Sequence, residues 1–231
     1  MATVHEDRES GTATPVAMEG GPTVSSITSP DQELCRSFKT VTEMLRDRGQ
    51  PSEVLESMSA EDVLQAAMNR PYVFYIDDPK IGYRIIYDIV NPTFKLQTHK
   101  KMLESMPPEI KSVIIVIRKR VANTTTEAST EKFFRDIGIE EQFFELKRLQ
   151  FNLTRHFLVP KHEPIRDEET IGRILAQYML KSRFQLPIIY DKDPMAQYLA
   201  LKHGQLVKIT RNSPTAGVHV VYRCCCTKAE K

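Results

Sequence analysis

The run SVIIVI (residues 112–117) decides how the first half of this chain folds. Six consecutive apolar, mostly β-branched residues are typical of a strand that is buried on both faces. A helical pattern precedes the run in KLQTHKKMLESM (95–106) and another follows it in TEASTEKFFRDIG (126–138). Because strand and helix alternate around this run, we expect it to lie inside a small α/β unit.

Further strand patterns lie on both sides of these helices. YVFYIDD (72–78) and IGYRIIYDIV (81–90) are rich in β-branched and aromatic residues and are separated by a turn at Asp78-Pro79-Lys80. EEQFFEL (140–146) returns to strand character after the second helix. We therefore expect one mixed sheet covering roughly residues 31–150.

The chain enters this unit through a helix. Four apolar residues recur at spacings of four, three and four and share one face: Leu34, Phe38, Val41 and Leu45. Ser29 or Asp31 can cap its start, and Gly49 followed by Gln50-Pro51 ends it.

A second short helix fits SAEDVLQAAM (59–68), with Ser59 as its N-cap. Asp62 stands where a capping box usually has Glu or Gln, so that signal is incomplete and residues 50–70 stay open between helix and loop. Residues 1–30 are rich in Gly, Ser, Thr and Pro, and we expect a disordered tail there. The first residues lack the basic and apolar regions of a signal peptide.

The second half has a different pattern. FNLTRHFLVPKHEPI (151–165) is apolar and interrupted by prolines, and Asp167 then caps a helix over 167–181. Asp193-Pro194 begins another short helix. QLVKITR (205–211) and VHVVYRC (218–224) are strand patterns on either side of a turn. We expect a compact α+β unit over 151–231, which makes the fold class of the whole chain α+β / α/β.

Composition excludes several function classes. A net charge of +2 is too balanced for a protein that coats nucleic acid by itself, and no apolar run reaches the roughly 18–20 residues that span a bilayer.

Gly204 stands alone before a strand, whereas phosphate loops place several glycines between a strand and a helix. Lys208 and Arg211 lie three apart on one strand, so they face opposite ways and cannot form one grip. We expect no cofactor and no catalytic residue.

A zinc site is a weaker alternative. Its candidate ligands are His156, His162, His203, His219 and Cys224–Cys226. Consecutive residues on a strand point to alternating faces, so at most two of the three adjacent thiols could meet one ion. We therefore expect no metal, with the cysteines ending a strand as small, partly buried residues in a reducing compartment.

A cluster of cations follows the buried run directly. Arg118-Lys119-Arg120 precedes NTTTEAST (123–130), which we expect to form a threonine-rich turn. Cations, hydroxyls and backbone N–H groups presented together can hold phosphates without reading bases. The alternative is a solvated strand end with no ligand.

From about Asn152 onward the chain resembles the fifth-numbered subunit of eukaryotic nuclear RNA polymerases, a family that has an archaeal counterpart. The matching segments are NLTRHFLVPKHEPI, the helix ending in Tyr178, QLP (185–187), DPMAQYLALKHGQLVKITR and SPTAGVHVVYR. Upstream the resemblance is thinner and rests on EMLRDRG (43–49), VFYID and SVIIVI.

The resemblance implies a non-catalytic subunit in two parts: a C-terminal assembly domain that docks on the largest polymerase subunit, and an N-terminal jaw beside downstream DNA. It implies one copy per complex beside other polymerase subunits, no membrane, and a nuclear location (nucleolar if the chain serves polymerase I alone). The implied docking positions are Asp193, Pro194, Tyr198, Gly204, Gln205, Lys208, Arg211, Thr215, Gly217, Tyr222 and Arg223. The resemblance further implies weak phosphate contacts to DNA from Arg118, Lys119, Arg120, Thr124 and Thr125.

Four departures from the family's pattern point to a specialised member. The family commonly has arginine at Ile188, Gln197 and Val218, and glycine at Ala200. Losing three guanidiniums removes bidentate donors from one small module, so we expect a paralogue committed to one polymerase, either polymerase I or a plant-type extra polymerase. The alternatives are a free-standing transcription adaptor that reuses the C-terminal module, or an enzyme such as a nuclease or nucleotide-binding protein.

Overall fold

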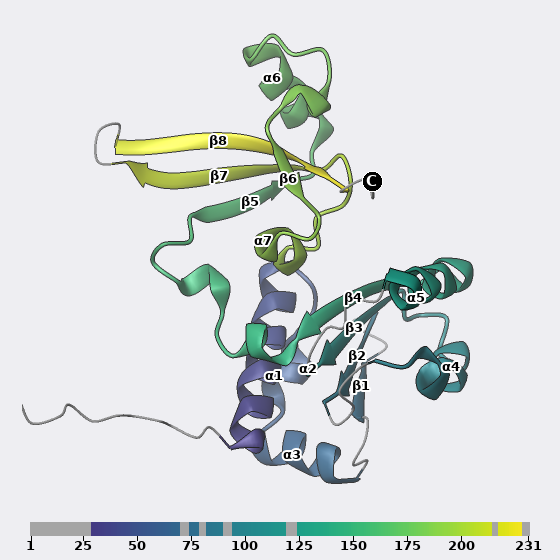
Figure 1. Cartoon of the computed structure of the whole chain (residues 1–231). Coiled ribbons are helices and arrows are strands. Elements are labelled where there is room, and N and C mark those ends of the chain that lie inside the picture. The colour runs from purple at the N-terminus through teal and green to yellow at the C-terminus, as the bar shows by residue number, and fades with distance from the viewer. Residues whose placement is uncertain are drawn as a thin grey trace, which may run out of the picture.

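The structure is a computed structural model that describes residues 29–69, 74–78, 82–89, 94–118, 124–213 and 217–227. Two four-stranded sheets lie one after the other along the chain, each with its own helices (Figure 1). The expected combination of an α/β first half and an α+β second half is confirmed. The tail expected over residues 1–30 lies almost wholly outside the described residues.

The first sheet has the strand order β1-β2-β3-β4, in which β1 is antiparallel to β2 and the other neighbours are parallel. Helices α4 and α5 connect the parallel strands and cover one face (Figure 1). The elements are β1 (Phe74–Asp78), β2 (Tyr83–Asp88), α4 (Leu96–Glu104), β3 (Ser112–Ile117), α5 (Thr124–Ile137) and β4 (Glu140–Glu145).

The run SVIIVI is β3, and all six of its residues are buried. Val113 and Ile115 pack with Phe134 of α5 on one face, whereas Ile114 and Val116 belong to a second cluster on the other face. Helix α1 (Pro30–Asp47) covers that second face (Figure 1). The strand therefore lies between two helical layers, which is why it carries no polar alternation.

Helix α1 begins and ends as expected. Ser29 accepts a hydrogen bond from the Gln32 backbone N–H, and Gly49 adopts a φ of 75° after the last turn. That left-handed conformation costs glycine nothing.

The open segment 50–70 contains two helices, α2 (Glu53–Ser57) and α3 (Ala60–Asn69). The capping box at Ser59 is complete, contrary to our expectation. The Ser59 hydroxyl accepts from the Asp62 N–H at 3.1 Å, and the Asp62 carboxylate accepts from the Ser59 N–H at 2.9 Å. The shorter Asp side chain thus reaches as far as the usual Glu.

The hydroxyl-rich stretch after β3 also differs from expectation. Thr124 and Thr125 already lie in the first turn of α5 rather than in a turn before it. A threonine in a helix costs well under about 1 kcal/mol relative to alanine, so three of them in a row do not delay the helix start.

The second sheet has the strand order β5-β7-β8-β6, with β6 parallel to β8 and the other pairs antiparallel. Its elements are β5 (Lys161–Ile165), α6 (Glu168–Gln177), β6 (Ile188–Tyr190), α7 (Pro194–Tyr198), β7 (Leu206–Ser213) and β8 (Gly217–Cys226). Three short 3₁₀ turns, η1 (Leu146–Leu149), η2 (Leu153–Arg155) and η3 (Arg183–Gln185), link these parts.

Strands β5 and β6 were not expected from the sequence. Both lie at the edges of the second sheet, and Pro164 stands inside β5 while Pro187 immediately precedes β6. An edge strand needs hydrogen bonds on one side only, so it tolerates proline where a central strand does not.

Candidate functional site

Helix α7 begins the stretch in which most of the expected docking residues lie. The Asp193 carboxylate accepts from the Met195 backbone N–H at 2.8 Å, and Pro194 occupies the first helical position. Asp193 is half-buried and Pro194 is exposed. Both residues therefore fix where the helix starts, and Pro194 remains on the surface.

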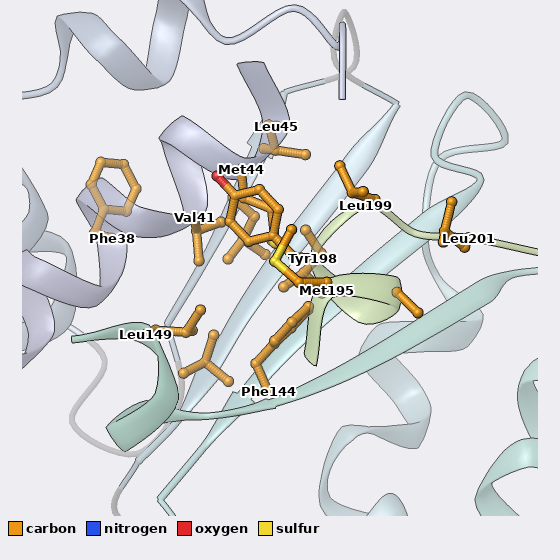
Figure 2. Close-up of a cluster of buried hydrophobic side chains, with 14 of the residues drawn as sticks. Phe38, Val41, Met44, Leu45, Phe144, Leu149, Met195, Tyr198, Leu199 and Leu201 are labelled. Atoms are coloured by element: carbon orange, nitrogen blue, oxygen red, sulfur yellow. The ribbon is translucent and has the colours of Figure 1, made fainter. Parts of the chain in front are cut away.

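Tyr198, at the end of α7, is buried rather than exposed. Its ring lies in the largest apolar cluster beside Met44 and Met195, and Figure 2 shows side chains from α1, β4 and α7 converging there. Its hydroxyl donates a 2.6 Å hydrogen bond to Asp47 at the end of α1. Burial is the main reason why the pKa of Tyr198 is raised. Tyr198 thus holds the two halves of the chain together. Gly204, another of the expected docking residues, is also buried.

Arg48 lies at the same junction and is 4% exposed. Its Nε donates to the Tyr198 carbonyl at 2.7 Å, and its Nη2 donates to the Gln197 carbonyl at 3.0 Å and to Gln142 Oε1 at 2.8 Å. Both carbonyls lie in the last turn of α7, where a helix runs out of intrahelical donors. The Gln197 carbonyl also accepts from the Ala200 backbone N–H at 3.1 Å, and the guanidinium adds a second bond to it. Burial lowers the pKa of Arg48. Nothing in the sequence pattern EMLRDRG distinguished this arginine from its exposed neighbour Arg46.

Polar contacts surround the junction. Asn152 donates to Glu43 at 2.8 Å, Arg155 forms an ion pair with the same carboxylate, and Lys202 pairs with Glu140. A groove of about 1140 Å³ runs beside the junction. Charged residues of both signs line it, and two pairs are formed among them, Arg183 with Glu168 and Lys202 with Glu140, so the groove does not concentrate charge of one sign.

The chain conformation just after α7 is strained. Ala200 has a φ of 51°, in the left-handed region that favours glycine. This is the position at which the resemblance leads to an expectation of glycine.

Both faces of the β7–β8 hairpin mix polar and apolar side chains. Register pairs Lys208 with Tyr222 and Arg211 with His219, so Lys208 and Arg211 face opposite ways as expected. One face carries Lys208 beside Val218, Val220 and Tyr222, and the other carries Arg211, His219 and Arg223 beside Ile209 and Val221.

The remaining expected docking residues lie on or near this hairpin. Arg223 donates to the Ile188 carbonyl at 2.8 Å and so covers part of the open edge of β6, while Gln205 accepts from the Lys202 N–H. Gly217 is exposed with a φ of 67°, and Thr215 lies outside the described residues.

Exposed apolar side chains gather on the second half. Within the described part of the chain, nine of the ten large exposed hydrophobic residues come after residue 150: Phe151, Phe157, Leu158, Tyr178, Met179, Phe184, Ile188, Tyr190 and Val218. Val54 is the tenth. Where exposed apolar side chains form a contiguous patch, such a patch is typical of protein–protein interaction sites.

The residues expected to face DNA are described only in part. Arg118 is exposed at the end of β3, while Lys119 and Arg120 lie outside the described residues. Thr124 and Thr125 belong to α5, and the directions of their side chains are not described. The grouping of these five residues therefore stays a prediction.

The cysteines are placed for packing. Cys224 and Cys225 are buried, and burial raises the pKa of each thiol to about 11. Among the described residues, no group of three or more histidine, cysteine or acidic side chains is arranged to hold a metal ion. No helix that the structure describes is long and apolar enough to cross a membrane.

The sequence patterns did not indicate a buried His99–Asp88 pair. The two side chains are 2.9 Å apart, and Phe94 stacks on the imidazole with ring centroids 4.8 Å apart. The spacing of His99 and buried Leu103, four residues apart on α4, is the signal that could have revealed its burial. The pair fastens α4 to the end of β2.

Comparisons with known proteins agree with this geometry. The family model described as RNA polymerase Rpb5, C-terminal domain, matches residues 151–225. The subunit named rpabc1 of DNA-directed RNA polymerases I, II and III from Dictyostelium discoideum is 32% identical over 83% of this chain and 96% of its own length. The corresponding Caenorhabditis briggsae protein is 34% identical over 83% of this chain and 84% of its own length.

A plant relative matches a similar span. The DNA-directed RNA polymerase subunit 5-like protein 1 of Arabidopsis thaliana is 30% identical over 84% of this chain and 97% of its own length. The similarity therefore covers both sheets, well beyond the C-terminal module. The chain belongs to the Rpb5 family of DNA-directed RNA polymerase subunits.

Proposed function

We propose that this chain is a non-catalytic structural subunit of a nuclear DNA-dependent RNA polymerase. It docks on the largest subunit through its second half, and its first half lies near downstream DNA. One copy is present in each complex, beside the other polymerase subunits. The observation that carries the proposal is the concentration of exposed apolar side chains after residue 150, because a large assembly buries such a surface.

Charge supports the same assignment of roles. Residues 151–231 contain thirteen Lys and Arg and seven Asp and Glu, a net charge of +6. Residues 1–150 contain nineteen Lys and Arg and twenty-three Asp and Glu, a net charge of −4. A basic docking module fits an acidic partner surface, whereas the first half is net acidic and cannot bind DNA tightly by itself, so it would lie near DNA only because the complex holds it there.

Affinity purification of the tagged full chain from its own cells tests the docking. We expect the largest polymerase subunit at one-to-one stoichiometry. The double change Phe157→Ser with Leu158→Ser removes two side chains that are 88% and 71% exposed, so it should release the polymerase without unfolding the chain. Val54→Ser, on the first half, is the matched control and should keep it. Recovery of the wild-type chain free of polymerase would instead favour a transcription adaptor.

We further propose that the chain is committed to one polymerase. At Ile188 and Val218, where the resemblance leads us to expect arginine, the chain presents apolar side chains that are 45% and 65% exposed. A partner surface that accepts both needs apolar rather than acidic contacts at those two points. The location is then nuclear, and nucleolar if the partner is polymerase I.

The same purification separates the two cases. Commitment predicts one largest subunit in the recovered material, whereas equal recovery of those of polymerases I, II and III would contradict it. Ile188→Arg with Val218→Arg should broaden the set of recovered polymerases.

A further inference from the structure

We propose that Arg48 is a positioning residue that fixes the angle between the two sheets, so that the chain moves as one rigid lever. The inference rests on the proposed function only for its consequence, namely that the first half is held at a set place in the complex. The angle between the two sheets is a property of the free chain.

Three segments meet at the Arg48 guanidinium. The residue itself follows the last turn of α1, Gln142 is on β4, and the Gln197 and Tyr198 carbonyls end α7. Arg48 therefore joins β4, in the sheet of the first half, to α7, which belongs to the second half. A planar fork with several fixed donors holds its acceptors in one relative orientation.

The apolar cluster at the junction has a different effect. Val41 and Met44 of α1 pack against Met195 and Leu199 of the second half (Figure 2). Apolar burial is non-directional, so these contacts hold the two halves together without requiring particular hydrogen-bond partners. The directional bonds of Arg48, together with the Tyr198–Asp47 bond and the buried Asn152–Glu43 bond, select one orientation.

The surface contacts at the junction are weaker constraints. Arg155 pairs with Glu43 across the junction, but its side chain is 62% exposed. Exposed ion pairs contribute little because water and salt screen them. Arg48 is nearly inaccessible to water, so its hydrogen bonds have no solvent replacement within the native arrangement.

A distance measurement on the free full-length chain tests the proposal. Spin labels attached through a keto amino acid at Lys132 on α5 and Gln177 on α6, both exposed, report the separation of the halves without involving the native cysteines. The wild type should give one narrow distribution. We expect Arg48→Gln and Arg48→Lys to widen it about twofold, because each loses the fork.

The matched control is Arg36→Gln, an exposed arginine on α1 that lies twelve residues before Arg48 and away from the junction. It should leave the distribution unchanged. Hydrogen exchange on β3 and β7 shows whether each half stays folded in the variants.

Unchanged width in both Arg48 variants would overturn the proposal, and so would joint loss of protection in the two sheets, which would make Arg48 a residue of a single folding core. Neither result bears on polymerase binding, so failure here is distinguishable from failure of the proposed function.

Discussion

The hydroxyl of Tyr198 donates a hydrogen bond to Asp47, a residue 151 positions earlier in the chain. Residues before 150 and residues after it therefore share one apolar cluster, with Tyr198 at 4% exposure inside it. Each half has its own sheet, but neither has a closed core of its own at this junction.

Removing that hydroxyl should weaken the whole chain. Tyr198→Phe leaves the ring in place and the Asp47 carboxylate without this donor, so we expect a loss of about 1–2 kcal/mol in the free energy of unfolding. Urea denaturation followed by circular dichroism measures it. Tyr190→Phe, at a tyrosine that is 50% exposed, should change the value by less than about 0.5 kcal/mol.

Relieving the backbone strain at Ala200 should have the opposite effect. Ala200→Gly removes the Cβ from a residue in the left-handed conformation, so we expect the free energy of unfolding to rise by about 1 kcal/mol. Urea denaturation measures this change. The same change at Ala176, an exposed residue inside α6, should cost about 0.5–1 kcal/mol because glycine is more flexible in the unfolded chain. A loss at both positions would show that Ala200 is not strained.

The N-cap of α6 should make stability depend on pH in the acid range. Hydrogen bonds from Thr170 lower the pKa of Asp167, so its contribution is present above the unfolded pKa of about 4 and is lost as pH falls through the folded value. Asp167→Asn keeps an acceptor oxygen but does not titrate. The difference in melting temperature between wild type and variant should therefore shrink as pH falls from 6 to 3, which differential scanning calorimetry follows.

Exposed Gln177, at the other end of α6, gives the control for that experiment, because its side chain does not titrate. The difference produced by Gln177→Asn should change far less over the same pH range. A difference that grows on acidification for Asp167→Asn would contradict the cap.

Binding of duplex DNA by the free chain should be weak and strongly dependent on salt, as expected of contacts to phosphates alone. Arg118→Ala should reduce the slope of log affinity against log salt by about 1, in a fluorescence anisotropy titration. Arg36→Ala, an exposed arginine on α1, should leave the slope unchanged. Nanomolar, sequence-specific binding would rule out this mode.

Alkylation should distinguish the three adjacent cysteines. Burial raises the pKa of Cys224 and Cys225 to about 11, so little of either thiol is ionised at pH 8, whereas Cys226 is partly exposed. Iodoacetamide followed by mass spectrometry should find Cys226 modified first, with Cys224 and Cys225 reacting only in urea. Equal rates in the native chain would show that this end of β8 opens readily.

The sequence was informative where one residue pattern dictates one environment. SVIIVI has no polar alternation, and it forms the strand that is buried on both faces. It was less informative where tertiary structure decides the outcome. Pro164 lies inside edge strand β5, and Pro187 directly precedes edge strand β6. Proline argues against a central strand, so the sequence pattern did not indicate a strand at either place.

The junction was the largest omission. Arg46 and Arg48 look alike in EMLRDRG, yet one is exposed and the other is 4% exposed, because the acceptors of Arg48 lie about 150 residues further along the chain. Tyr198 was expected on a docking surface and is buried inside the chain instead, so any role in docking would be to support that surface. Such distant partners cannot be identified from the residues next to Arg48 or Tyr198 in the sequence.

The distance between α1 and α7 along the chain also governs the order of events during synthesis. Helix α1 is among the first elements made, but the carbonyls that Arg48 holds are not synthesised until residue 198. For most of translation the apolar face of α1 lacks its second partner, and this is the interval in which nascent chains aggregate or recruit chaperones. A ribosome stalled before α7 would therefore display an incomplete junction, and the first half becomes fixed in place only when the chain is nearly finished.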